Sequence, residues 1–134
     1  MQTETGGTSS RPVILLAEDD ALTARLIVHR LEREGYEVLH YPDGQAALDA
    51  AQANDAEPYA LAILDVKMPR MDGFELLGRL KEDPKLAPTP VVMLTGMGSE
   101  QDVVRALSGG ADDYILKPFS PTELALRVQR LLAR

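Results

Sequence analysis

The sequence contains no cysteine. A chain without cysteine cannot form a disulfide framework, perform thiol chemistry or hold a metal on thiolates. It also has no apolar run that approaches the roughly 18 residues of a membrane span. Its first ten residues, MQTETGGTSS, have neither the basic stretch nor the apolar core of a signal peptide. These absences favour a soluble cytoplasmic protein in which residues 1–11 form a flexible tail.

Positive charge is scarce as well. The chain has 14 Lys and Arg residues against 21 Asp and Glu residues, which gives a formal net charge of −7. A basic surface for phosphate backbones is therefore absent, and we expect no direct nucleic-acid binding by this chain. Its 134 residues suit one domain, which we place at residues 12–134. A chain of this length can bury a core without disulfides or structural metals.

Short apolar runs alternate with segments of helical spacing along the chain. Each apolar run is typical of a buried strand, and Gly, Pro, Asp or Ser stands at most of the boundaries. We predict strands at 13–17, 36–41, 59–65, 90–96 and 113–117. We predict helices at 21–35, 43–54, 73–83, 99–110 and 120–134.

This order of strand and helix, repeated five times, predicts an α/β fold. Strict alternation with short loops indicates one five-stranded parallel sheet, doubly wound, with helices on both faces. In such folds, ligands bind outside the carboxyl ends of the strands, at a topological switch point. The residues that follow the strands are therefore the candidates for a functional site.

Polar residues stand at four of these strand ends. The first strand is followed by acids at 18–20, the third ends at Asp65, the fourth at Thr95 and the fifth at Lys117. If these strands are neighbours, several carboxylates meet one hydroxyl and one ammonium. Two like charges 4 Å apart repel by roughly 4 kcal/mol at an effective dielectric near 20, so such a cluster calls for a cation.

The chemistry that suits these side chains is phosphoryl transfer with a divalent metal. Oxygen ligands with room for water suit Mg²⁺ better than zinc. Lys117 would hold a phosphoryl oxygen and Thr95 would donate a hydrogen bond to another. Asp65 is the candidate nucleophile, because a carboxylate can form an acyl phosphate.

Each of these residues also has an ordinary structural explanation. Asp19 or Asp20 could cap the first helix, Asp65 could be a turn residue, and Lys117 could be a solvated lysine. The histidines at 29 and 40 are isolated in different elements, so we interpret them as structural or surface residues. The functional interpretation is favoured because four weak signals coincide at the ends of four strands.

Four segments of the sequence resemble the receiver domain of two-component response regulators. They are LLAEDD, LAILDVKMPRMDGFELL, VVMLTG and GGADDYILKPFSPTELALR, and the resemblance extends over about residues 12–133. It implies a flavodoxin-like sheet of five parallel strands. It also implies that the chain takes a phosphoryl group from a sensor histidine kinase or phosphotransfer protein onto an aspartate, with Mg²⁺ as cofactor.

The resemblance assigns the residues of the metal and phosphoryl site. Glu18 and Asp19 match the acidic pair, Asp65 the phosphoacceptor, and Lys67 the residue whose backbone carbonyl is the third protein ligand to the metal. Many members have Asp where this chain has Glu18. Lys67, together with Met97, also occupies a position that tunes hydrolysis of the acyl phosphate in the family.

Three further residues match the part of the family's site that reads out phosphorylation. Thr95 corresponds to the switch hydroxyl, Tyr114 to the switch aromatic and Lys117 to the phosphate-binding lysine. In the family the Lys-Pro bond that follows is usually cis, which aims the next loop. Cis bonds are essentially a proline phenomenon, so we expect one between Lys117 and Pro118.

The last part of the sequence resembles regulators with a winged-helix DNA-binding output. Those proteins typically dimerise through the fourth helix, fifth strand and fifth helix. Residues that match their salt-bridge network are Asp112, Asp113, Glu123 and Arg127, whereas Val103 and Ser108 occupy positions that are usually charged. Dimerisation through this face therefore stays open.

Three other functions fit the sequence less well. A receiver-like interaction module that is never phosphorylated is disfavoured because every site residue is present. A haloacid-dehalogenase-like phosphohydrolase needs a second aspartate two residues after the nucleophile, where this chain has Lys67. A P-loop NTPase is excluded, because no Gly-rich loop with Lys-Ser or Lys-Thr is present.

Overall fold

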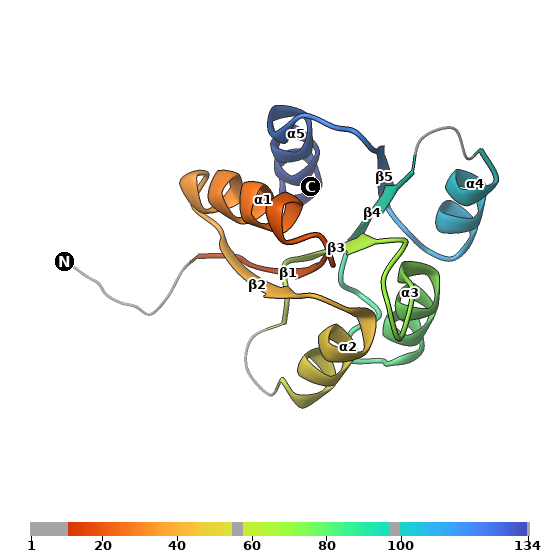
Figure 1. Cartoon of the computed structure of the whole chain (residues 1–134). Coiled ribbons are helices and arrows are strands. Elements are labelled where there is room, and N and C mark those ends of the chain that lie inside the picture. Colours follow the sequence, from red (N-terminus) through yellow and green to blue (C-terminus); the bar gives the residue numbers. More distant parts are fainter. Residues whose placement is uncertain (1–10, 55–57, 97–99, 134) are drawn as a thin grey trace.

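The computed structural model describes residues 11–54, 58–96 and 100–133. Strand and helix alternate five times, as predicted (Figure 1). The strands are β1 (Val13–Ala17), β2 (Glu37–Tyr41), β3 (Leu61–Asp65), β4 (Val91–Thr95) and β5 (Asp113–Leu116). The helices are α1 (Ala21–Arg33), α2 (Gly44–Ala53), α3 (Gly73–Glu82), α4 (Glu100–Ser108) and α5 (Pro121–Leu132). Over the described residues, no helix is long and apolar enough to cross a membrane.

All five strands are parallel and belong to one sheet in the order β2-β1-β3-β4-β5. This order confirms the doubly wound, flavodoxin-like fold. The chain first moves from β1 outward to β2 and then returns across β1 to β3, so the winding reverses between β1 and β3. The carboxyl ends of these two central strands therefore mark the topological switch point.

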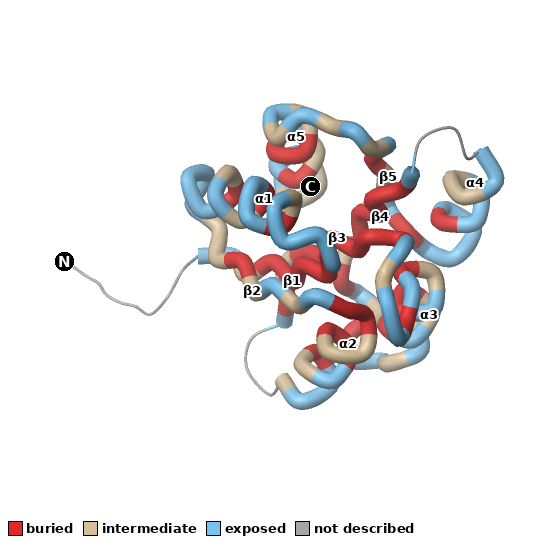
Figure 2. The backbone as a smooth tube through the Cα atoms, in the orientation of Figure 1, coloured by how far each residue is buried: buried red, intermediate tan, exposed pale blue. Residues whose placement is uncertain are grey.

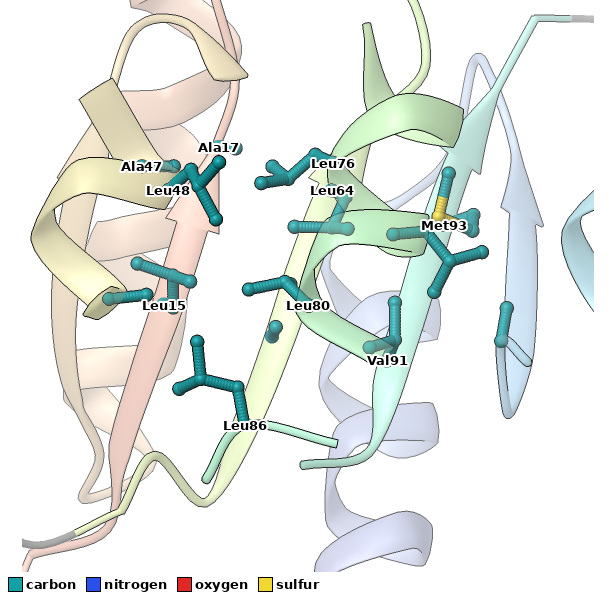
Figure 3. Close-up of a cluster of buried hydrophobic side chains, with 14 of the residues drawn as sticks. Leu15, Ala17, Ala47, Leu48, Leu64, Leu76, Leu80, Leu86, Val91 and Met93 are labelled. Carbon is teal, nitrogen blue, oxygen red and sulfur yellow. The ribbon is translucent and has the colours of Figure 1, made fainter. Parts of the chain in front are cut away.

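Two apolar clusters cover the two faces of the sheet. One lies under α1 and α5 and includes Ile27 and Leu124. The other lies under α2 and α3 and includes Leu48 and Leu76, which Figure 3 shows between the helices and the sheet. The central strands are buried along their length in Figure 2. Because both faces are covered, these strands need the continuous apolar runs seen in the sequence.

Polar side chains define the starts of four helices. Side-chain oxygens of Asp20, Asp43, Asp72 and Ser120 each accept a hydrogen bond from a backbone N–H three residues later. Such N-caps each stabilise a helix by about 1 kcal/mol. Asp43 and Ser120 stand at the predicted starts of their helices. The predicted start at residue 99 lies outside the described residues.

The fifth strand is less buried than its apolar run predicts. Only Ile115 is buried in β5, and the side chain of Leu116 is 41% exposed. The strand also ends one residue early, so that Lys117 follows it. The reason is its position: β5 lies at the edge of the sheet. Its neighbour α4 has a single buried residue among those described, Ala106, and so covers it poorly.

Candidate functional site

The switch point between β1 and β3 brings three carboxylates together. Glu18 follows β1 and is fully buried, Asp19 is exposed, and Asp65 at the end of β3 is 4% exposed. One carboxylate oxygen from each residue lies within 4.8 Å of those of the other two. The strand ends thus place these acids as the sequence predicts, and we call them the acidic corner.

The side chain of Lys117, which directly follows the edge strand β5, extends into the acidic corner. Its Nζ lies 3.0 Å from Asp65 Oδ1 and 3.1 Å from Glu18 Oε1. Its backbone N–H donates to the carbonyl of Thr95 over 2.7 Å, which ties the residue to the end of β4. The bond between Lys117 and Pro118 is cis, as expected.

The electrostatics of the corner are unbalanced. Burial, followed by the neighbouring Glu18, raises the pKa of Asp65 to about 7, although Lys117 acts in the opposite direction. Burial alone would lower the pKa of Lys117, but Asp65 and Glu18 outweigh it, and the pKa of the ammonium is raised. Two buried carboxylates therefore share one ammonium, and a further cation beside them would relieve the excess negative charge.

The side chains of the corner fit a hard divalent cation. All the candidate ligand atoms are carboxylate oxygens, and the exposed Asp19 leaves one side accessible to water. This donor set suits Mg²⁺, which binds to few protein oxygens and keeps several waters. Asp19 and Lys67 line the same cleft of about 540 Å³, in which the Lys67 residue is exposed.

The end of β4 contributes a buried hydroxyl. Thr95 is fully buried, and its Oγ1 has no hydrogen-bond partner among the described residues. Tyr114 pairs in register with Met93, two residues before Thr95, so Thr95 and Tyr114 face the same side of the sheet. Tyr114 is half-buried against the apolar cluster under α2 and α3.

A close backbone contact fixes the loop after Asp65. The N–H of Gly73 donates to the carbonyl of Val66 over 2.8 Å. A Cβ at Gly73 would lie only 2.3 Å from the backbone oxygen of Asp65. Only glycine therefore allows α3 to begin this close to the strand end. In the sequence, an Asp-Gly pair before a helix indicates only a turn and does not reveal this packing role.

Two other contacts near the site were not predicted. His40 Nε2 lies 2.8 Å from the backbone oxygen of Glu18. The guanidinium of Arg105 stacks on the ring of Phe74, 4.2 Å from its centroid. The available signal was the position of His40 near the end of β2, which lies beside β1. Met97, which the resemblance pairs with Lys67, lies outside the described residues.

Comparison with protein families supports the resemblance. Residues 14–129 match the family model of the response regulator receiver domain. The transcriptional regulatory protein SrrA of Staphylococcus aureus is 42% identical over 121 residues, which are 90% of this chain and 48% of that protein. The chain thus spans about half the length of the curated relatives it matches.

Solved structures share the fold over nearly the whole chain. A signal receiver domain of a signal transduction histidine kinase from Syntrophus aciditrophicus is 40% identical, with a TM-score of 0.82, covering 91% of this chain and 90% of that one. A putative response regulator from Chloroflexus aurantiacus is 34% identical, with a TM-score of 0.86, covering 93% and 100%. A third relative, the receiver domain of the sensor histidine kinase PA1611 from Pseudomonas aeruginosa, is 27% identical with a TM-score of 0.83, covers 93% of this chain and all of that one, and has a magnesium ion coordinated in its active site cleft.

Proposed function

The chain belongs to the family of response regulator receiver domains, and on that premise we propose that Asp65 accepts a phosphoryl group from a sensor histidine kinase or phosphotransfer protein. The observation that carries the proposal is the contact of 3.0 Å between Lys117 Nζ and Asp65 Oδ1 inside the acidic corner. The ammonium is placed where it can hold a phosphoryl oxygen once Asp65 carries the group.

The proposed step is an in-line displacement at phosphorus. A carboxylate oxygen of Asp65 forms the new P–O bond, the P–N bond of the donor phosphohistidine breaks, and the ring nitrogen leaves with its electron pair. The residues that would hold Mg²⁺ are Glu18, Asp19, Asp65 and, through its carbonyl, Lys67, and the bound ion would offset negative charge on the carboxylates and phosphoryl oxygens. Lys117 holds a phosphoryl oxygen as a fixed positive charge, and catalysis consists of positioning and electrostatics.

The proposed readout begins at Thr95. Its buried hydroxyl, which has no partner among the described residues, would donate to a phosphoryl oxygen on Asp65. Movement of this side chain would free space on the face of the sheet that it shares with Tyr114. The aromatic ring would turn into that space and change the surface of β5 and α4. A local charge thereby biases an element with two arrangements.

The face formed by α4, β5 and α5 is the proposed output and dimer surface. Its apolar side chains Val104, Leu107, Leu116 and Leu126 are each at least 41% exposed. Arg127 pairs with Asp113 at 2.9 Å within the chain. The matching acid Asp112 also accepts the N–H of Val91 over 2.9 Å, so its carboxylate has a structural role as well.

Sedimentation tests the dimer surface. With beryllofluoride and Mg²⁺, the chain should gain a dimer that Leu107→Asp abolishes, because a charge would replace an exposed apolar contact. A chain that stays monomeric at every concentration tested would show that phosphorylation acts on a different partner.

The homologous SrrA is a transcriptional regulatory protein, and we propose a similar regulatory output for the protein that contains this domain.

Intact mass after incubation with acetyl phosphate tests the central proposal. Wild type with Mg²⁺ should gain one phosphoryl mass, and the gain should be lost in Asp65→Asn or in excess chelator. If Asp65→Asn gains the mass as readily, the assignment of the phosphoacceptor is wrong. If wild type gains none while the fold is intact, the chain is an interaction module with a receiver fold.

A further inference from the structure

We propose that His40 is a positioning residue of the acidic corner and holds the backbone of Glu18 in the geometry that the metal and phosphoryl site needs. His40 is the last residue but one of β2 and pairs in register with Leu16 of β1, two residues before Glu18. Its Nε2 lies 2.8 Å from the backbone oxygen of Glu18. A carbonyl oxygen only accepts hydrogen bonds, so Nε2 carries the proton and donates it.

This contact completes the set of interactions around Glu18. The N–H of Glu18 donates to the Tyr41 carbonyl over 3.1 Å. Its Oε1 pairs with Lys117 at 3.1 Å, and its Oε2 accepts the N–H of Asp20 over 3.1 Å. Glu18 is thus held through its N–H, its carbonyl and Oε2 by hydrogen bonds, whereas Oε1 has only the ion pair with Lys117 and no hydrogen bond among the described residues. The bond from His40 is the one that comes from a side chain on the edge strand.

The backbone of Glu18 also sets the direction of the next residue. Asp19 is exposed, and the described residues offer it no hydrogen bond or ion pair that would orient its carboxylate. Its position relative to Asp65 therefore depends on the peptide that joins it to Glu18. Loss of the bond from His40 would let this peptide rotate, and the carboxylates would bind a cation less well. Partners of this kind, one step behind the ligands, commonly change metal affinity by about 10-fold or more.

Three variants separate this positioning role from the general effect of replacing a histidine. His40→Ala removes the donor. His40→Gln keeps an N–H donor on a flexible chain of comparable length. His29→Ala is the matched control, because His29 is an exposed histidine on α1, away from the end of β2. The measurements are the Mg²⁺ dissociation constant at a fixed pH of about 8 and the exchange of the Asp20 amide in metal-free protein.

We expect His40→Ala to weaken Mg²⁺ binding by about threefold to tenfold and to speed exchange of the Asp20 amide by a similar factor, as befits one lost hydrogen bond. His40→Gln should recover most of both effects, and His29→Ala should match wild type. Equal Asp20 exchange in wild type and His40→Ala overturns the proposal, as does a Gln variant no better than Ala.

The inference rests on the proposed function only where Mg²⁺ binding is measured. If wild type binds no Mg²⁺, the proposed function fails, while Asp20 exchange in the metal-free variants still decides whether His40 positions the corner. If wild type binds Mg²⁺ and takes a phosphoryl group on Asp65 but His40→Ala binds the ion equally well, the proposed function stands and the role of His40 is overturned.

Discussion

The two halves of the sheet's carboxyl edge are held in contrasting ways. At the acidic corner, the buried Glu18 has hydrogen bonds with Tyr41, His40 and Asp20 and an ion pair, but no hydrogen bond, between its Oε1 and Lys117. Toward α4, among the residues described, the hydroxyl of Thr95 has no partner and the helix itself has one buried residue. The other four helices each bury at least three.

This contrast matches the two tasks that we propose for the domain. Phosphoryl transfer needs fixed charges at known positions, and the corner supplies them. A signal needs an element whose position can change at a small cost in free energy. A helix with few buried contacts is such an element, because it belongs to the least stable part of a fold. The structure thus combines a rigid chemical site with a weakly attached helix, and Thr95 lies between them.

The largest expected effect is on the rigid half. Asp65 has a pKa near 7 in the folded protein against about 4 when unfolded. Folding therefore binds a proton between these values, and stability falls as pH rises through that window. Asp65→Asn removes the ionisation, so its advantage over wild type should grow by about 2 to 3 kcal/mol between about pH 5 and pH 8.

Urea denaturation in metal-free buffer at the two pH values measures this effect. The exposed Asp49 on α2 provides the control, because Asp49→Asn removes the same charge from the surface. Its stability relative to wild type should change little with pH. A wild type as stable at pH 8 as Asp65→Asn, or a difference that shrinks as pH rises, would show that the carboxyl is not under this strain.

A smaller effect is expected on the loose half. The stack of Arg105 on Phe74 joins α4 to the start of α3, and an exposed cation–π contact contributes about 0.5 to 1 kcal/mol. Arg105→Gln and Phe74→Leu should each speed amide exchange in α4 by about twofold to fivefold. The double variant should exceed neither single variant by much, because both remove the same contact.

Arg79→Gln is the control for this pair. Arg79 is an exposed arginine on α3, for which the described part of the chain offers no ion pair or ring contact. Its replacement should leave exchange in α4 unchanged. Additive effects of the Arg105 and Phe74 substitutions would mean that the stack does not attach the helix.

The smallest expected effect concerns the lifetime of the acyl phosphate. The Lys67 side chain offers donors only and cannot accept a proton from the attacking water in a hydrogen bond. Lys67→Asn should therefore speed decay by about twofold to threefold, and Lys67→Asn/Met97→Glu by more, since acids and amides can orient water. Decay of phosphorylated protein, followed by intact mass, measures the rate. Equal rates in all three proteins would show that these side chains do not set the lifetime.

The sequence predicted which side chains meet at the carboxyl edge of the sheet, because these residues lie at or just after the ends of strands. Asp65 and Thr95 end strands and Lys117 directly follows one. The apolar runs already define the order of these strands, so the meeting of the three residues at one edge follows from topology. The contacts of His40 and Arg105 could not be predicted in the same way, because they depend on side-chain direction across separate elements. The exposure of Leu116 was missed because an apolar run does not reveal which strand lies at the edge.

Amide exchange with and without beryllofluoride and Mg²⁺ is the most direct test of the contrast between the two halves. We predict that exchange changes most in α4 and β5, changes little at the backbone of 18–20, and stays unaltered in Asp65→Asn. A response confined to the acidic corner, or one of equal size in α1 and α4, would contradict the account.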